Sequence, residues 1–173
     1  MTTKMKGCKL LHYIGHAEDG RLLVESDDDV GLRDWVDPRE HELVDRMTQC
    51  VVIQSPNHME VAEIFLSLKC APKHVIAIKQ PEDNFAHHVT DFILQFYYAL
   101  IEGNTTIRRA FLSGLYLFED PAAIAPQYRD TILDDFQLLP KKRESDLIIT
   151  GTVFRVCCPK SPCTFWSCLV VTD

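Results

Sequence analysis

The sequence predicts an α/β fold in which a mostly parallel sheet carries helices on both faces. Short apolar, β-branched runs, residues 51–53 and residues 74–78, are typical of strands that are covered on both faces. Segments with helical periodicity follow both runs along the chain. Strands that alternate with helices in this way favour a layered α/β architecture.

Length and composition are those of a globular chain with a real core. The 173 residues suit one domain, or one domain with a tail, and 46% of them are hydrophobic. The formal net charge of −7 disfavours nucleic acid or an anionic membrane as the main partner. The acidic run at residues 25–29 predicts a solvated loop. A calcium loop is set aside because its glycine and distal glutamate are not at the required spacing.

Cysteine usage predicts a reducing, cytoplasmic compartment with free thiols. There are seven cysteines, an odd number, and residues 1–9 lack the apolar core of a signal peptide. No stretch has the length and apolar character of a membrane span. Four thiols lie close together near the C-terminus, but their spacing is not that of paired zinc ligands and no histidine is near, so neither a metal nor a cofactor is expected; they are Cys157, Cys158, Cys163 and Cys168.

The first part of the chain predicts a strand over residues 8–14, which ends at the turn Gly15-His16-Ala17. A second short strand is expected over residues 21–25 after a Glu-Asp-Gly turn. An acidic loop should follow over residues 26–38, and a short helix over residues 40–47 should lead into the central strand.

The central unit spans residues 50–70 and combines a strand, a sharp turn and an amphipathic helix. Ser55 is expected to cap a helix whose first residue is Pro56, and Asn57 with Glu60 offers a second, overlapping capping pattern. Strand ends that precede helix starts are where open α/β sheets place their chemistry. One apolar helical face is formed by Val61, Ile64, Phe65 and Leu68.

The second part predicts a strand over residues 74–78, a long helix that ends at Gly103, and a further helix capped by Thr105 or Thr106. Residues 128–139 should form a helix or an irregular segment, and residues 146–156 a strand. The inward positions of the two helices are Phe85, Val89, Phe92, Ile93, Phe96, Leu100, Ile107, Ala110, Phe111, Gly114, Leu115 and Phe118.

Several segments, in order and at consistent spacing, resemble the CHAT domains of the caspase-like clan, which includes caspases, separases and metacaspases. The family's histidine segment, LHfsGHG, is matched by residues 11–17, LHYIGHA. Its strand vvLnACxSe corresponds to residues 51–58. Its hVIAi strand, its following helix pattern and its closing segment are similar to residues 74–78, 96–111 and 136–140.

The resemblance implies a three-layer caspase-like sandwich over residues 8–140. Residues 141–173 would then form a strand-rich, cysteine-rich extension that packs on or completes the same sheet. The family fold needs about two more strands before the histidine strand. We therefore expect a fold that is trimmed on its N-terminal side, a chain that belongs to a longer parent protein, or a sheet completed by the segment from Asp146.

The same resemblance places His16 at the general-base position and Pro56 at the nucleophile position. Proline carries no nucleophile, so the Cys–His chemistry of the clan is broken. Ser55 is an alternative nucleophile, although side chains of neighbouring strand residues point to opposite faces and a capping hydroxyl is already engaged. The expected binding residues are those of the turn: Gln54, Pro56, Asn57 and His58.

We expect a catalytically inactive domain that acts as a protein-interaction or regulatory module. The partner would be a protein or peptide, and the family implies a context of cell-death or innate-immune signalling. The alternative is an active cysteine- or serine-type peptidase with His16 as general base. Pairing with a second copy is possible at an exposed sheet edge. A nucleotide-binding domain is disfavoured because no glycine-rich phosphate loop follows any predicted strand.

Overall fold

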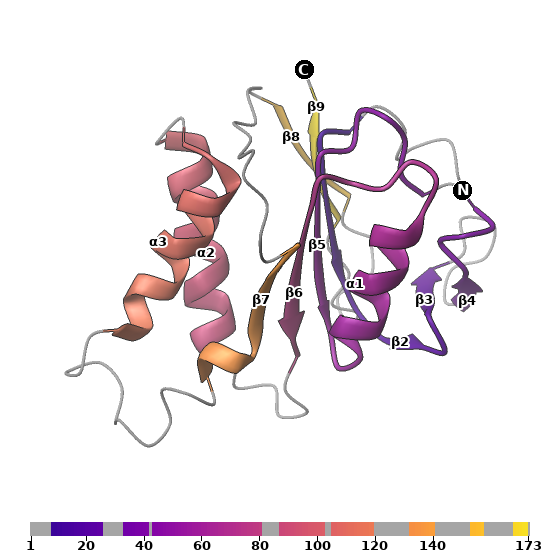
Figure 1. Cartoon of the computed structure of the whole chain (residues 1–173), viewed down its shortest axis with the longest axis horizontal. Coiled ribbons are helices and arrows are strands. Elements are labelled where there is room, and N and C mark those ends of the chain that lie inside the picture. The colour runs from indigo at the N-terminus through magenta and orange to yellow at the C-terminus, as the bar shows by residue number, and fades with distance from the viewer. Residues whose placement is uncertain are drawn as a thin grey trace.

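The fold is an α/β sandwich built on one six-stranded sheet, seen here in a computed structural model (Figure 1). The strand order is β7-β6-β5-β1-β9-β8. The predicted α/β class, with helices on both faces of the sheet, is confirmed. The structure describes residues 8–25, 33–41, 43–80, 87–102, 105–119, 132–140, 153–157 and 168–172.

The centre of the sheet is parallel, and its edges are antiparallel. Strand β5 (Cys50–Ser55) pairs in parallel with β1 (Leu10–Ile14) on one side and with β6 (His74–Lys79) on the other. The outer strands β7 (Phe136–Leu139), β9 (Cys168–Thr172) and β8 (Val153–Cys157) each pair antiparallel with their neighbours. The two C-terminal strands therefore extend the sheet beyond β1.

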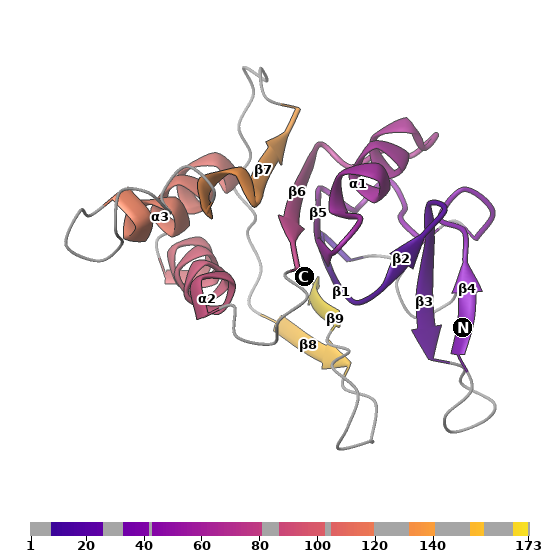
Figure 2. The same ribbon diagram turned by 90° about the horizontal axis from the view of Figure 1, so that it is seen from below.

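Helices cover the two faces of this sheet separately. Helix α1 (His58–Ser67) lies on one face, and the helices α2 (His87–Glu102) and α3 (Ile107–Glu119) lie on the other (Figures 1 and 2). The alternation of β5 side chains creates two cores. Cys50 and Val52 belong to the core under α2 and α3, whereas Val51 and Ile53 belong to the core under α1.

A small three-stranded antiparallel sheet lies beside α1. It contains β2 (Ala17–Glu18), β3 (Arg21–Glu25) and β4 (Arg33–Val36). The β2–β3 turn places Asp19 and Gly20 in the left-handed region, with φ of 51° and 72°. The positive φ at Gly20 favours glycine, and a Cβ there would also meet Cδ1 of Ile64, so the Ile64 side chain would have to move.

Most predicted helices and strands are present. The predicted strands before His16, over residues 21–25 and over residues 74–78 correspond to β1, β3 and β6. Thr106 caps α3, because its Oγ1 accepts the N–H of Arg109 at 3.2 Å. The described part of the two predicted inward helix faces is buried or half-buried, whereas Phe85 and Gly103 lie outside the described residues.

Two expectations about elements were wrong, and a third was right only in part. The helix predicted over residues 40–47 is absent from the described residues there, which form turns and irregular backbone. Leu43 and Val44 are both buried, and two adjacent side chains cannot share one helical face. The loop predicted over residues 26–38 contains β4. In the segment predicted as helical or irregular over residues 128–139, residues 132–134 are helical, but the segment ends in the strand β7.

The C-terminal thiols are described only in part. Cys157 and Cys168 are paired in register across β8 and β9. Cys158 and Cys163 lie outside the described residues, as does most of the strand predicted over residues 146–156. None of the helices in the described part of the chain combines the length and the apolar character that a membrane crossing requires.

Candidate functional site at the carboxyl edge of the sheet

The His16 turn and the turn after β5 leave the sheet at the same edge. Strands β1 and β5 run parallel in a register that pairs Leu10 with Cys50 and Ile14 with Gln54. The next residues of both strands therefore emerge side by side. The N–H of Gly15 donates to the carbonyl of Gln54 at 3.0 Å, which joins the two turns. We refer to residues 15–17 and 54–57 as the paired turns.

A second hydrogen bond joins the paired turns through a side chain. Nδ2 of Asn57 donates to the carbonyl oxygen of Ala17 at 2.8 Å. Asn57 stands immediately before α1, and Ala17 begins β2. The structure thus brings together two segments that the resemblance predicted to form one site.

His16 has a fixed backbone and an exposed side chain. Its carbonyl accepts the N–H of Leu23 at 3.0 Å and also the hydroxyl of Tyr13. The single proton of this hydroxyl is shared between the carbonyl of His16 and the carbonyl of Leu23, which lies 3.1 Å away. The small sheet therefore holds the backbone of His16 in place, while its imidazole faces solvent.

Ser55 is the last residue of β5 and is completely buried, with an exposed fraction of 0%. The expectation that it caps α1 was wrong, because the strand continues through Ser55 and the helix begins three residues later. Its hydroxyl oxygen has no hydrogen-bond partner among the described residues. An activated serine needs a base within hydrogen-bond reach, and Ser55 makes no such contact.

Cysteines do not replace the missing nucleophile in the described part of the chain. Cys50 pairs with Leu10 at the opposite end of β5 from the paired turns. It is fully buried, and burial raises the pKa of its thiol. A thiolate is the reactive form, so Cys50 is an inert core residue. Cys70 lies beyond the far end of α1.

The other predicted binding residues line the turn itself. Pro56 and Asn57 are exposed, whereas Gln54 and His58 are half-buried. His58 is the first residue of α1, and its Nδ1 donates to the carbonyl of Pro56 at 3.3 Å. Burial lowers the pKa of His58, and the Pro56 carbonyl opposes this shift. The neutral form is therefore favoured, and the turn presents a mixed polar and apolar surface.

A polar cluster next to the turn was not predicted from the sequence. Lys79 ends β6 and is paired in register with Ser55, and its Nζ lies 3.9 Å from Oδ1 of Asp135. The other carboxylate oxygen of Asp135 lies 3.5 Å from Nε2 of His88, a contact that is ionic only when the imidazole is protonated. Because Asp135 precedes β7, its position depends on a strand that the sequence pattern did not reveal.

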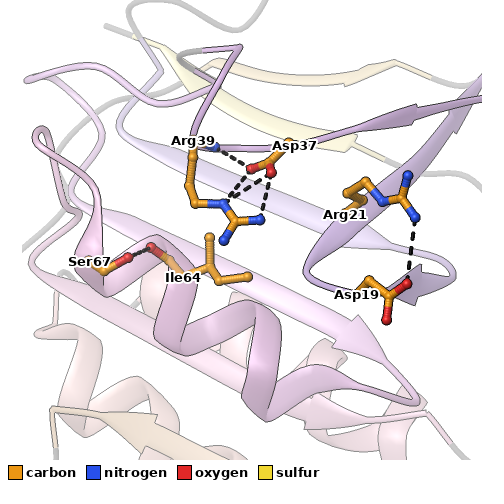
Figure 3. A network of polar contacts seen from close by, with 6 residues as sticks. All are labelled: Asp19, Arg21, Asp37, Arg39, Ile64 and Ser67. Atoms are coloured by element: carbon orange, nitrogen blue, oxygen red, sulfur yellow. Dashed lines mark hydrogen bonds and ion pairs between the residues drawn. The ribbon is translucent and has the colours of Figure 1, made fainter.

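Two ion pairs involve residues of the small sheet or of the segment that follows it. Arg39 donates from Nε and Nη2 to both carboxylate oxygens of Asp37, as Figure 3 shows, with a shortest distance of 2.6 Å. This guanidinium holds the pKa of Asp37 below its usual value. Arg21 and Asp19 form a looser pair at 3.6 Å. An exposed, single-contact pair such as Arg21–Asp19 contributes little to stability.

Comparison with protein-family models and with curated proteins gives no match to this chain. The resemblance to CHAT domains therefore remains a prediction from the motifs. Within the described residues, no group of three or more histidine, cysteine, aspartate or glutamate side chains is placed to hold a metal ion.

Proposed function

We propose that this chain is a catalytically inactive caspase-like module of the CHAT type, which binds a protein or peptide at the paired turns. One observation supports this most directly. The histidine turn and the turn after β5 are joined at the carboxyl edge of a parallel sheet, and the residue at the family's nucleophile position is Pro56. Such a module would retain the histidine turn and the turn after β5, but it would have no nucleophilic side chain at position 56.

The chemistry of the neighbouring residues agrees with loss of catalysis. The hydroxyl of Ser55 is buried on the α1 side of the sheet, and the thiol of Cys50 is buried at the other end of β5. The Ser55 hydroxyl has no hydrogen-bond partner among the described residues, and Cys50 is separated from the His16 turn by the length of the strand. The alternative of an active peptidase with His16 as general base therefore lacks a nucleophile in the described part of the chain.

The exposed groups of the turn suit recognition of a peptide. His16, Pro56 and Asn57 are exposed, and His58 is half-buried beside them. Binding sites combine apolar contact with a few well-placed polar groups, which this surface offers. The resemblance adds a signalling context, in cell death or innate immunity, to this proposal.

A displayed library of random peptides, selected against the immobilised chain, tests the proposal. The matched control carries Pro56→Arg and His16→Asp. The arginine adds a bulky side chain at the turn, and the aspartate introduces a negative charge there. We expect selected peptides that bind the unmodified chain at least about tenfold more tightly than the control, a difference of about 1.4 kcal/mol. We also expect no cleavage of these peptides during prolonged incubation.

Two results would contradict the proposal in different ways. Peptides that bind both proteins equally would show that the paired turns are not the binding surface. Cleavage that falls by about 10² or more in a His16→Ala variant would instead establish the active peptidase.

A further inference from the structure

Asn57 has the residue type of a helix cap but does not act as one. Asparagine is among the residues most favoured before the first turn of a helix, where its side-chain oxygen accepts a backbone N–H. At Asn57 no side-chain capping hydrogen bond forms. Its backbone, at φ −96° and ψ 38°, also lies outside the extended region that capping residues normally adopt.

The amide of Asn57 is used as a donor instead. Its Nδ2 reaches across to the carbonyl oxygen of Ala17 at 2.8 Å, forty residues earlier in the chain. An ionised aspartate would cap a helix equally well, but it has no proton to give to a carbonyl. The contact made here therefore depends on the side-chain N–H donor, which asparagine has and ionised aspartate lacks.

The contact completes the support of the His16 turn. On one side, Tyr13 and Leu23 donate to the carbonyl of His16. On the other side, Asn57 donates to the carbonyl of the next residue, Ala17. Without Asn57, the backbone hydrogen bond from Gly15 to Gln54 would be the remaining described link between the paired turns.

We propose that Asn57 is a positioning residue: its side-chain amide holds the His16 turn against the end of β5, and α1 forgoes its side-chain cap for this contact. The inference deepens the proposed function, because the site that Asn57 holds is the proposed binding surface. Its test needs no ligand, so it can fail while peptide binding succeeds, and the reverse is also possible.

The test compares Asn57→Asp and Asn57→Ser with Ser67→Ala in the full chain. Asn57→Asp is nearly isosteric and replaces the amide donor with a charged acceptor, whereas Asn57→Ser shortens the side chain, adds no charge and keeps a good capping residue. Ser67→Ala is the matched control, because Ser67 lies on the same helix and its hydroxyl bonds only within that helix, to the carbonyl of Ile64 at 2.7 Å.

Two NMR measurements read the outcome. Amide hydrogen exchange of Leu23 and Gly15, whose N–H groups hold the paired turns, should become about five- to tenfold faster in both Asn57 variants, as loss of one hydrogen bond predicts. The ring resonances of His16 should shift in the same variants. Neither measurement should change in Ser67→Ala.

An ordinary cap predicts the opposite pattern. If Asn57→Asp leaves the exchange of Leu23 and Gly15 and the His16 resonances unchanged, and slows exchange in the first turn of α1, Asn57 is a cap and the inference is wrong. Equal shifts of the His16 resonances in Ser67→Ala would also overturn it, because the effect would then belong to the helix as a whole.

Discussion

Acidification should destabilise the fold through one buried histidine, His12. This residue lies in the middle of β1, on the face covered by α2, and only 3% of it is exposed. Its Nδ1 shares a hydrogen bond with the hydroxyl of Tyr97 at 3.0 Å, and its Nε2 has no partner among the described residues. Burial lowers the pKa of His12 from its ordinary value of 6.5 to about 3.

The direction of the pH effect follows from this lowered pKa. Below pH 6.5 the unfolded chain takes up a proton at His12, whereas the folded chain does so only near pH 3. The free energy of unfolding should therefore fall as the pH falls through this window. Each pH unit costs about 1.4 kcal/mol, so about 2 kcal/mol should be lost at pH 5 relative to neutral pH. This loss is a large share of a typical stability of about 5–15 kcal/mol.

The assay is urea denaturation between pH 8 and pH 4.5 of the unmodified chain, His12→Gln and Ile76→Val. Ile76 is a fully buried neighbour in the same core, and its truncation lowers stability without removing a titratable group. The difference between the unmodified chain and His12→Gln should change by about 2 kcal/mol between pH 7 and pH 5. The difference from Ile76→Val should stay constant. Parallel profiles for all three proteins would refute the reasoning.

Two further substitutions test the packing around the sheet. Ser55→Ala should leave the free energy of unfolding unchanged or raise it by about 1 kcal/mol in urea denaturation, because it removes a buried hydroxyl without a described partner; a clear loss of stability would show that the hydroxyl is paired. Gly114→Ala should lower the melting temperature by a few degrees, because the added Cβ would lie 2.6 Å from Cδ2 of Phe92, whose ring stacks on Phe136 at 4.3 Å. The packing cost of about 1–3 kcal/mol exceeds the gain in helix propensity of about 1 kcal/mol, so a rise in melting temperature would contradict this account.

The parts of the fold that could be predicted from the sequence are those whose side-chain pattern is complete within one segment. The strand β5 is buried over residues 50–53, and the helix α2 buries one face, so each shows a complete apolar pattern within its own segment. The strands β4 and β7 are short. In β4, Asp34 and Trp35 are exposed and Val36 is half-buried, whereas β7 alternates buried and half-buried residues. Segments this short give a pattern that a loop or an irregular segment can also show.

The false helix over residues 40–47 has a related cause. Its charged composition favours a helix, but composition does not determine where the buried side chains point. Leu43 and Val44 are adjacent and both enter the core, and the backbone N–H of Thr48 closes a short turn on the carbonyl of Asp45. The tertiary structure here overrides the local preference.

At the candidate site, the segments could likewise be predicted from the sequence, but the contacts between them could not. The segments that form the paired turns could be chosen from the sequence, since each follows a recognisable apolar strand. The hydrogen bond from the Asn57 amide could not be predicted, because its acceptor, the carbonyl of Ala17, belongs to a segment forty residues earlier in the chain. The neighbouring contacts of Asp135 with Lys79 and His88 depend in the same way on strand β7.

The most direct test of the central claim is to return a thiol to the nucleophile position. In Pro56→Cys, the rate of alkylation by iodoacetamide at pH 7 is measured at each cysteine by peptide mass spectrometry, with and without His16→Ala. The half-buried natural thiol Cys70, at the far end of α1, is the internal reference.

If the paired turns form a caspase-like site that lacks only its nucleophile, His16 should activate the new thiol. Its alkylation should then slow by about tenfold or more when His16 is replaced, while the rate at Cys70 stays the same. A thiol at position 56 that reacts at the same rate with and without His16 would contradict the account, because the two turns would then share an edge of the sheet without sharing a site.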